Sequence, residues 1–218
     1  MTSLTCFAPH QALAEDLISV VHSIPGDTAH DLSHLLRVWQ NVRRISANEG
    51  GNARILTAAT LLHDSVALPK DAPDRAMASL KSAEFAEDLL TQRSWSAEDR
   101  KAVAHAIHAH SFSANVTPLT LEARILQDAD RLDALGHIGI ARCFAVSGAL
   151  GRALYDPADP QARHRPLDDT AFAIDHFQTK LLHLSGGFQT ATGRRLARER
   201  HAVLADFLSG FLAEVDGE

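Results

Sequence analysis

Residues 55–64 read ILTAATLLHD, an apolar run that ends in the polar pair His63–Asp64. The uncharged run predicts a buried helix, and Asn52 just before it is a suitable N-cap. A buried histidine next to a buried aspartate is costly to fold unless something compensates their polarity. A bound metal ion is one such compensation, so the pair is a candidate metal-binding feature.

Two further residues of ligand type, His34 and Asp130, lie in segments with helical patterning on either side of this pair. Two imidazoles and two carboxylates suit a divalent ion that keeps coordination positions open for water. An ion held in this way can lower the pKa of a bound water and polarise a phosphoryl oxygen. The sequence therefore predicts one site formed by His34, His63, Asp64 and Asp130. The alternative is that each residue is an independent surface or capping group.

Composition and periodicity predict an all-α protein, because helix-forming residues are abundant and no stretch alternates as a strand does. We expect helices over about 11–23, from Thr28 to Gly50, from Asn52 to about 66, over 74–92, behind Ser96, behind Thr120, over 138–146, over 170–184 and over 190–215. The intervening segment 148–169 is too long for an ordinary connection, which indicates a functional loop or lid. No linker separates independent cores, so residues 1–218 are expected to form a single domain.

The bulk properties exclude several classes of function. The 218 residues are 45% hydrophobic and 22% charged, with a net charge of −6, which argues against general nucleic-acid binding but allows a small anionic substrate. Cys6 and Cys143 are too few for a disulfide scaffold or a thiolate zinc cluster. No membrane span or signal segment is visible, so we expect a cytoplasmic protein.

Three motifs carry a resemblance to a known family. They are HLLRV at 34–38, LLHD at 61–64 and DADRLDA at 128–134, supported by HSFS at 110–113, GIAR at 139–142 and KLL at 180–182. They resemble the HD superfamily of metal-dependent phosphohydrolases, in particular its small stand-alone bacterial branch, over about residues 28–205. The resemblance implies a single-domain HD-type helical bundle with His34, His63, Asp64 and Asp130 as ligands of a divalent ion. The ion itself is left open among Mn, Mg, Zn, Ni, Co and Fe.

The surroundings of the quartet supply candidates for substrate contacts. His30 lies one helical turn before His34, Lys70 follows a proline break after Asp64, and His110 lies in one of the matching motifs. Arg165 belongs to a cationic stretch of the long loop. We expect these four to bind substrate, with Lys70 also neutralising charge in catalysis and Asp64 serving as both ligand and proton acceptor. For each of the four the alternative is an ordinary solvated or second-layer polar residue.

One departure from the family pattern bears on the reaction. Members that act on nucleoside monophosphates often carry His-Asp-x-x-Glu, and the glutamate position here is Ala67. We therefore expect a phosphohydrolase of a nucleotide or related phosphate ester, with a slight preference for a nucleoside triphosphate cleaved to monophosphate and pyrophosphate. The alternatives are a di-iron oxygenase of the same fold, which would need additional ligands such as His105 or His108, and a non-catalytic binding domain stabilised by metal. A homo-oligomer is compatible with the sequence.

Overall fold

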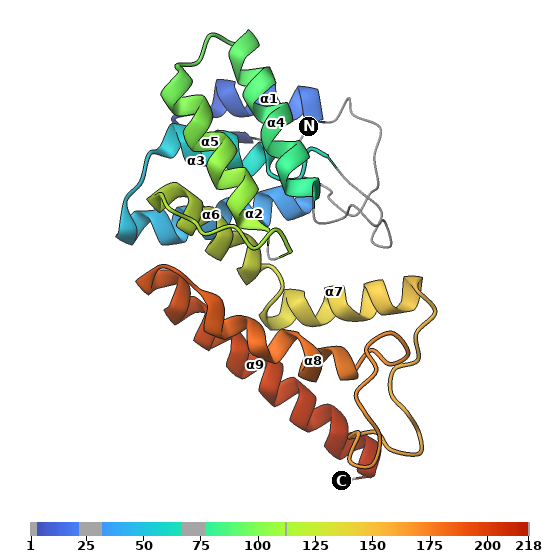
Figure 1. The fold of residues 1–218 in the computed structure, drawn as a ribbon. Coiled ribbons are helices and arrows are strands. Elements are labelled where there is room, and N and C mark those ends of the chain that lie inside the picture. Colours follow the sequence, from blue (N-terminus) through green and yellow to red (C-terminus); the bar gives the residue numbers. More distant parts are fainter. Residues whose placement is uncertain (1–3, 22–31, 67–76, 112, 218) are drawn as a thin grey trace. The chain divides into compact units, whose positions relative to one another are not determined.

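The computed structural model describes residues 4–21, 32–66, 77–111 and 113–217. Regular structure in these ranges is helical, apart from one isolated parallel bridge between Ala153 and Phe172 (Figure 1). The predicted all-α fold is therefore confirmed. Among the described helices, none is both long enough and apolar enough to cross a membrane.

The chain divides into two compact units, which we call the N-terminal unit (Met1–Asp130) and the C-terminal unit (Arg131–Glu218). The first contains η1 (Leu4–Phe7), α1 (Gln11–Val21), α2 (Leu32–Glu49), α3 (Ala53–Leu62), α4 (Ala78–Gln92), α5 (Ala97–His110) and most of α6 (Leu121–Leu132). The second contains α7 (Gly136–Ala149), α8 (Asp175–Thr179), η4 (Leu181–Gly187) and α9 (Ala191–Asp216). The expectation of one domain remains a prediction.

Helix α3 is the central helix of the N-terminal unit, because every residue from Ile55 to Leu62 is buried. Its predicted cap is confirmed: the Asn52 side chain accepts hydrogen bonds from the backbone N–H groups of Arg54 and Ile55. The predicted end near residue 66 is wrong, since the helix stops at Leu62. His63 is the C-cap residue of α3, and its backbone still has helical angles.

Local polar bonds explain why α3 stops early. The Ser65 hydroxyl donates to the Leu62 carbonyl, and the backbone N–H of Val66 donates to the Ser82 hydroxyl on α4 at 3.1 Å. Serine side chains compete in this way with the backbone bonds that would continue a helix. His63 and Asp64 therefore lie in a turn just past the helix, fixed from both sides.

Three of the other predicted helix starts are confirmed by side-chain caps, whereas the helix predicted over 138–146 begins at Gly136. Ser96 accepts from the Asp99 N–H, Thr120 accepts from the Ala123 N–H, and Thr190 accepts from the Gly193 N–H. The predicted start at Thr28 lies outside the described residues, as do residues 74–76 of the helix predicted over 74–92.

In the C-terminal unit, the helix predicted over 170–184 is wrong. The structure has turns up to residue 174, the short helix α8 and then the 3-10 helix η4. The Asp168 carboxylate accepts from the N–H groups of Thr170 and Ala171, which commits this stretch to a turn rather than a helix. The core of the unit contains stacked Phe177 and Phe207, with ring centroids 5.6 Å apart.

The predicted long loop is irregular, and it is held by a buried ion pair. Asp175 is fully buried and bonds the Arg165 guanidinium through both carboxylate oxygens. Arg165 also lies 3.2 Å from Asp156 and stacks over the ring of Phe172. These contacts stabilise the loop within the C-terminal unit.

Candidate metal centre

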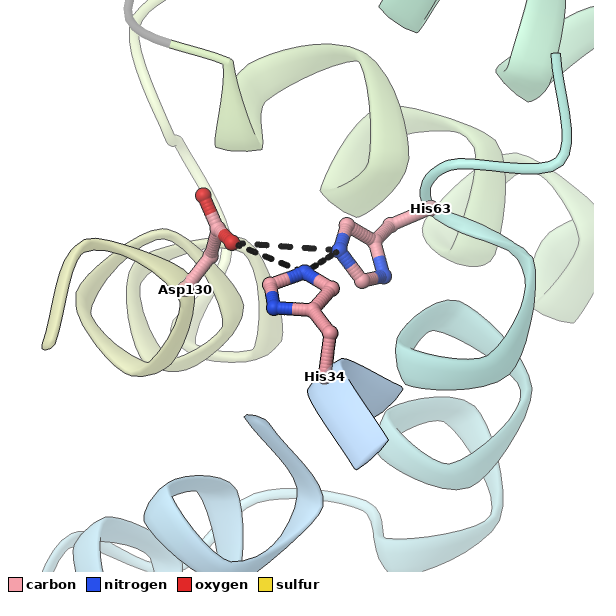
Figure 2. A group of neighbouring side chains, drawn as sticks. All are labelled: His34, His63 and Asp130. Atoms are coloured by element: carbon pink, nitrogen blue, oxygen red, sulfur yellow. Dashed lines mark hydrogen bonds and ion pairs between the residues drawn. The ribbon is translucent and has the colours of Figure 1, made fainter. Parts of the chain in front are cut away.

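Side chains from three separate segments of the N-terminal unit converge at one place. His34 comes from the first described turn of α2, His63 and Asp64 follow α3, and Asp130 lies in the last turn of α6. Figure 2 shows His34, His63 and Asp130 pointing toward one another. The structure thus brings together all four residues that the sequence predicts as ligands.

The donor atoms are close enough to share one ion. The two histidine Nε2 atoms lie 3.3 Å apart (Figure 2). Asp130 Oδ1 lies 3.5 Å from His34 Nε2 and 3.9 Å from His63 Nε2, while Asp64 Oδ2 lies 3.8 Å and 3.4 Å from the same two atoms. Ligand bonds of about 2.1 Å place donors about 3 Å apart at right angles and about 4.2 Å apart on opposite sides. The five observed separations lie between these values, so the histidine pair fits one divalent ion with either carboxylate.

The tautomer of His63 leaves its Nε2 lone pair available to a metal ion. Its Nδ1 lies 2.7 Å from the Thr60 carbonyl, which can only accept, so Nδ1 carries the hydrogen and Nε2 is left to face the cluster. His63 is fully buried, and burial lowers its pKa to about 4 although the nearby charges of Asp64 and Asp130 act in the opposite direction. The neutral form that binds metals is therefore the stable one near neutral pH.

The backbone around the centre also favours a cation. Helices α3, α5 and α6 each end within a few residues of a cluster side chain: His63 follows α3, His110 ends α5 and Asp130 lies in the last turn of α6. The C-terminal end of a helix carries a partial negative charge and carbonyls without a partner inside the helix. Three such ends together add to the attraction of the two carboxylates for a positive ion.

His110 joins the cluster from the side of Asp64. Its Nε2 lies 3.6 Å from Asp64 Oδ1, while its Nδ1 lies 2.5 Å from the Ile107 carbonyl. Burial lowers the pKa of His110, but the hydrogen bond with Asp64 and the charges of both aspartates outweigh burial and raise it. The two oxygens of Asp64 thus face different partners.

The described residues contain two overlapping groups with metal-ligand spacing, and both include His63. The second group adds Asp64 and His110. Since Nδ1 of His63 is bonded to Thr60, the only lone pair that His63 offers is on Nε2, which can bind one ion. If His63 binds one ion, a second ion would have only Asp64 and His110 as ligands from these groups in the described part of the chain.

Three further predicted site residues are His30, Lys70 and Arg165. His30 and Lys70, like Ala67, lie outside the described residues. Arg165 bonds carboxylates of its own unit, and its predicted contact with a substrate phosphate remains a prediction. His105, considered as an extra ligand, accepts a hydrogen bond at Nε2 from the Leu119 N–H, and burial lowers its pKa.

Sequence reasoning missed two polar residues next to the centre. Asn41 on α2 and Gln127 on α6 are both buried and bonded to backbone carbonyls of neighbouring helices. The signal for Asn41 was present, because it interrupts the apolar stripe formed by Val38, Val42 and Ile45. The partner of each residue, however, depends on the tertiary fold.

Comparison with known families supports the motif reading. A family model described as the HD domain matches residues 31–135, the segment that holds the whole cluster. The YpgQ protein of Bacillus subtilis is 33% identical over 210 residues, which cover 94% of this chain and 94% of that protein.

Solved structures agree over nearly the whole chain. An HD-superfamily hydrolase from Bacillus thuringiensis has a TM-score of 0.74 and 33% identity, with 95% of this chain and 99% of that chain covered. Bacillus subtilis YpgQ in complex with ADP has a TM-score of 0.71 and 30% identity, with 94% and 98% of the two chains covered. Both alignments span residues of both units.

Proposed function

The chain belongs to the HD superfamily, and from that premise we propose that it is a metal-dependent phosphohydrolase acting on a nucleotide or a related phosphate ester. The observation that carries the proposal is the convergence of His34, His63, Asp64 and Asp130 at distances that fit one divalent ion. HD domains bind divalent metals, and this chain provides the donors.

The four residues of the quartet would hold the ion. When bound, a divalent ion makes water acidic enough to lose a proton near neutral pH and withdraws charge from a phosphoryl oxygen. Asp64 directs Oδ2 toward the histidine pair and Oδ1 toward His110. It is therefore suited both to hold the ion and to accept a proton, and we propose that His110, beside it, hydrogen-bonds a phosphate oxygen.

We propose one ion per chain. His63 has a single available lone pair, so the two overlapping groups cannot both be filled. Two of the histidines that a di-iron centre could recruit are His105 and His110. The first is bonded to the Leu119 backbone, and the second reaches only Asp64 among the quartet's carboxylates in the described residues. Hydrolysis at a mononuclear centre therefore accounts for the arrangement better than oxygenation.

We further propose that the substrate is a nucleoside triphosphate that is cleaved to monophosphate and pyrophosphate. The binding of ADP by the related YpgQ supports a nucleotide. Ala67, at the position where monophosphate-specific members often carry glutamate, argues against a monophosphatase. Lys70, six positions beyond Asp64, is the proposed cation that would neutralise charge developing on the phosphates.

The test is a panel of nucleoside mono-, di- and triphosphates assayed with Mn²⁺, with orthophosphate and pyrophosphate measured separately. We expect pyrophosphate from triphosphates and no turnover after removal of divalent ions with a chelator. Asp64→Asn should abolish turnover, whereas Asp206→Asn, at an exposed position of α9, should not change it. Orthophosphate from monophosphates, with triphosphates untouched, would overturn the proposed cleavage.

A further inference from the structure

Two buried amide side chains donate hydrogen bonds to backbone carbonyls next to the candidate centre. Asn41 Nδ2 lies 2.9 Å from the carbonyl oxygen of Ala129, the residue before Asp130. Gln127 Nε2 lies 2.6 Å from the carbonyl oxygen of Ala109, the residue before His110. Asn41 is 4% exposed and Gln127 is 3% exposed, so neither bond competes with bulk water.

Both carbonyls belong to the last turn of a helix. Ala129 lies in the last four residues of α6, and Ala109 lies in the last four residues of α5. Carbonyls at these positions have no partner inside their own helix, so an outside donor determines how the helix end is held. The two amides link α2 to α6 and α6 to α5.

Burial of apolar surface alone does not explain why amides occupy these positions. Asn41 lies on the apolar face of α2, where a side chain such as leucine would bury more apolar surface. Gln127 bonds through Nε2, but its buried Oε1 has no hydrogen-bond partner among the described residues. An unpaired buried polar atom is unfavourable, and residues that break a folding rule tend to serve a functional site.

We propose that Asn41 and Gln127 are positioning residues of the metal centre, Asn41 for Asp130 and Gln127 for His110. The inference rests on the proposed function, since it assigns the two amides to the same site. Each amide acts through the backbone of the residue before its target, and neither touches the ion or the substrate. Partners behind metal ligands commonly change metal affinity or activity by about 10–100-fold when they are removed.

The two residues have different expected signatures. Asn41 fixes a ligand of the ion, so its loss should weaken metal binding. Gln127 fixes His110, which faces Asp64 Oδ1 and is not one of the four proposed ligands, so its loss should lower kcat at saturating metal while metal affinity changes little. A merely structural role would change the melting temperature of both variants without this split.

The experiment compares Asn41→Leu and Gln127→Met with the wild-type full-length chain. Mn²⁺ affinity is measured by calorimetry, and pyrophosphate release is measured at saturating Mn²⁺. We expect the Mn²⁺ Kd of Asn41→Leu to rise about 10-fold or more. For Gln127→Met we expect a Kd within about threefold of wild type and a kcat reduced about 10-fold. If the apolar variants do not fold, the smaller Asn41→Ala and Gln127→Ala variants also remove the donating NH₂ group.

Matched controls test whether the effects depend on the location of the two amides at the centre or on a general loss of an amide or of stability. Asn48→Leu removes an exposed amide of α2 that donates to the Arg44 carbonyl. Gln11→Met removes an amide of α1 that donates to the Glu15 carboxylate. Leu17→Ala, in the buried face of α1, supplies a general loss of stability. All three should leave the Mn²⁺ Kd and kcat near wild type. Site variants that melt earlier but bind Mn²⁺ and turn over as the controls do would overturn the inference. A wild-type chain that binds no divalent ion would instead contradict the proposed function.

Discussion

Acidification should destabilise the metal-free protein through His63. This residue is fully buried, and burial lowers its pKa from 6.5 to about 4. In the unfolded chain the imidazole returns to its ordinary value, so the unfolded state takes up a proton first as the pH falls. The unfolding free energy that depends on neutral His63 is therefore intact above pH 6.5 and decreases between about pH 6.5 and 4.

The expected magnitude follows from the pKa difference. One pKa unit corresponds to about 1.36 kcal/mol, so the full difference from 6.5 to about 4 is about 3.4 kcal/mol. At pH 5 about 2 kcal/mol of this is lost. His110 acts in the opposite direction, because its raised pKa contributes stability that is present below pH 6.5 and is lost as pH rises through the folded value. The net change in the wild type should therefore be smaller than the His63 contribution.

Urea unfolding with a chelator at pH 7.5 and pH 5 measures this contribution by difference. Wild type should lose about 2 kcal/mol more than His63→Leu between the two pH values. His183→Leu, at an exposed position of η4, is the matched control and should behave as wild type. With Mn²⁺ present the wild-type loss should be larger, since the ion binds only the deprotonated nitrogen. Equal losses in wild type and His63→Leu would refute the reasoning.

Two further predictions concern single residues. Asp130→Asn should raise the Mn²⁺ Kd by about 10-fold or more while leaving the helical content unchanged, because it removes a charged donor and keeps the side-chain shape; calorimetry and circular dichroism check this, and an unchanged Kd would exclude Asp130 as a ligand. Phe177→Ala should lower the unfolding free energy by about 3–5 kcal/mol, because the ring is fully buried against Phe144 and Phe207. Leu150→Ala, at a residue that is 54% exposed, should change it by less than about 0.5 kcal/mol in the same denaturation assay.

Much of the helical framework could be predicted because it depends on local chemistry. Asn52, Ser96 and Thr120 begin helices where the sequence places them, since a cap requires only a side-chain oxygen and the next few N–H groups. The predicted end of α3 and the predicted helix over 170–184 were wrong because local side-chain bonds override the helical pattern there. Ser65 and Asp168 bond the backbone in ways that helical periodicity does not report.

The four ligand residues of the candidate site could be predicted from the sequence, but the contacts of the residues around them could not. The quartet follows from the residue types and their motifs. That His110 would face one oxygen of Asp64, and His105 a backbone N–H, depends on where α5 lies against its neighbours. Asn41 finds its carbonyl partner 88 residues along the chain, a pairing that only the tertiary structure reveals. The division into two units was not predicted either, because the boundary falls inside α6 and no linker sequence marks it.

The spacing of the donors along the chain has a consequence for how the protein is made. His34 comes from an early helix and Asp130 from the end of the N-terminal unit, so nearly the whole unit must be synthesised and packed before the donors meet. Contacts between such distant residues form late, because the chain entropy of closing the long loop must be lost first. Tight capture of a metal ion should therefore coincide with completion of this unit during biosynthesis. A metal-loaded molecule would then be one whose N-terminal unit has already folded.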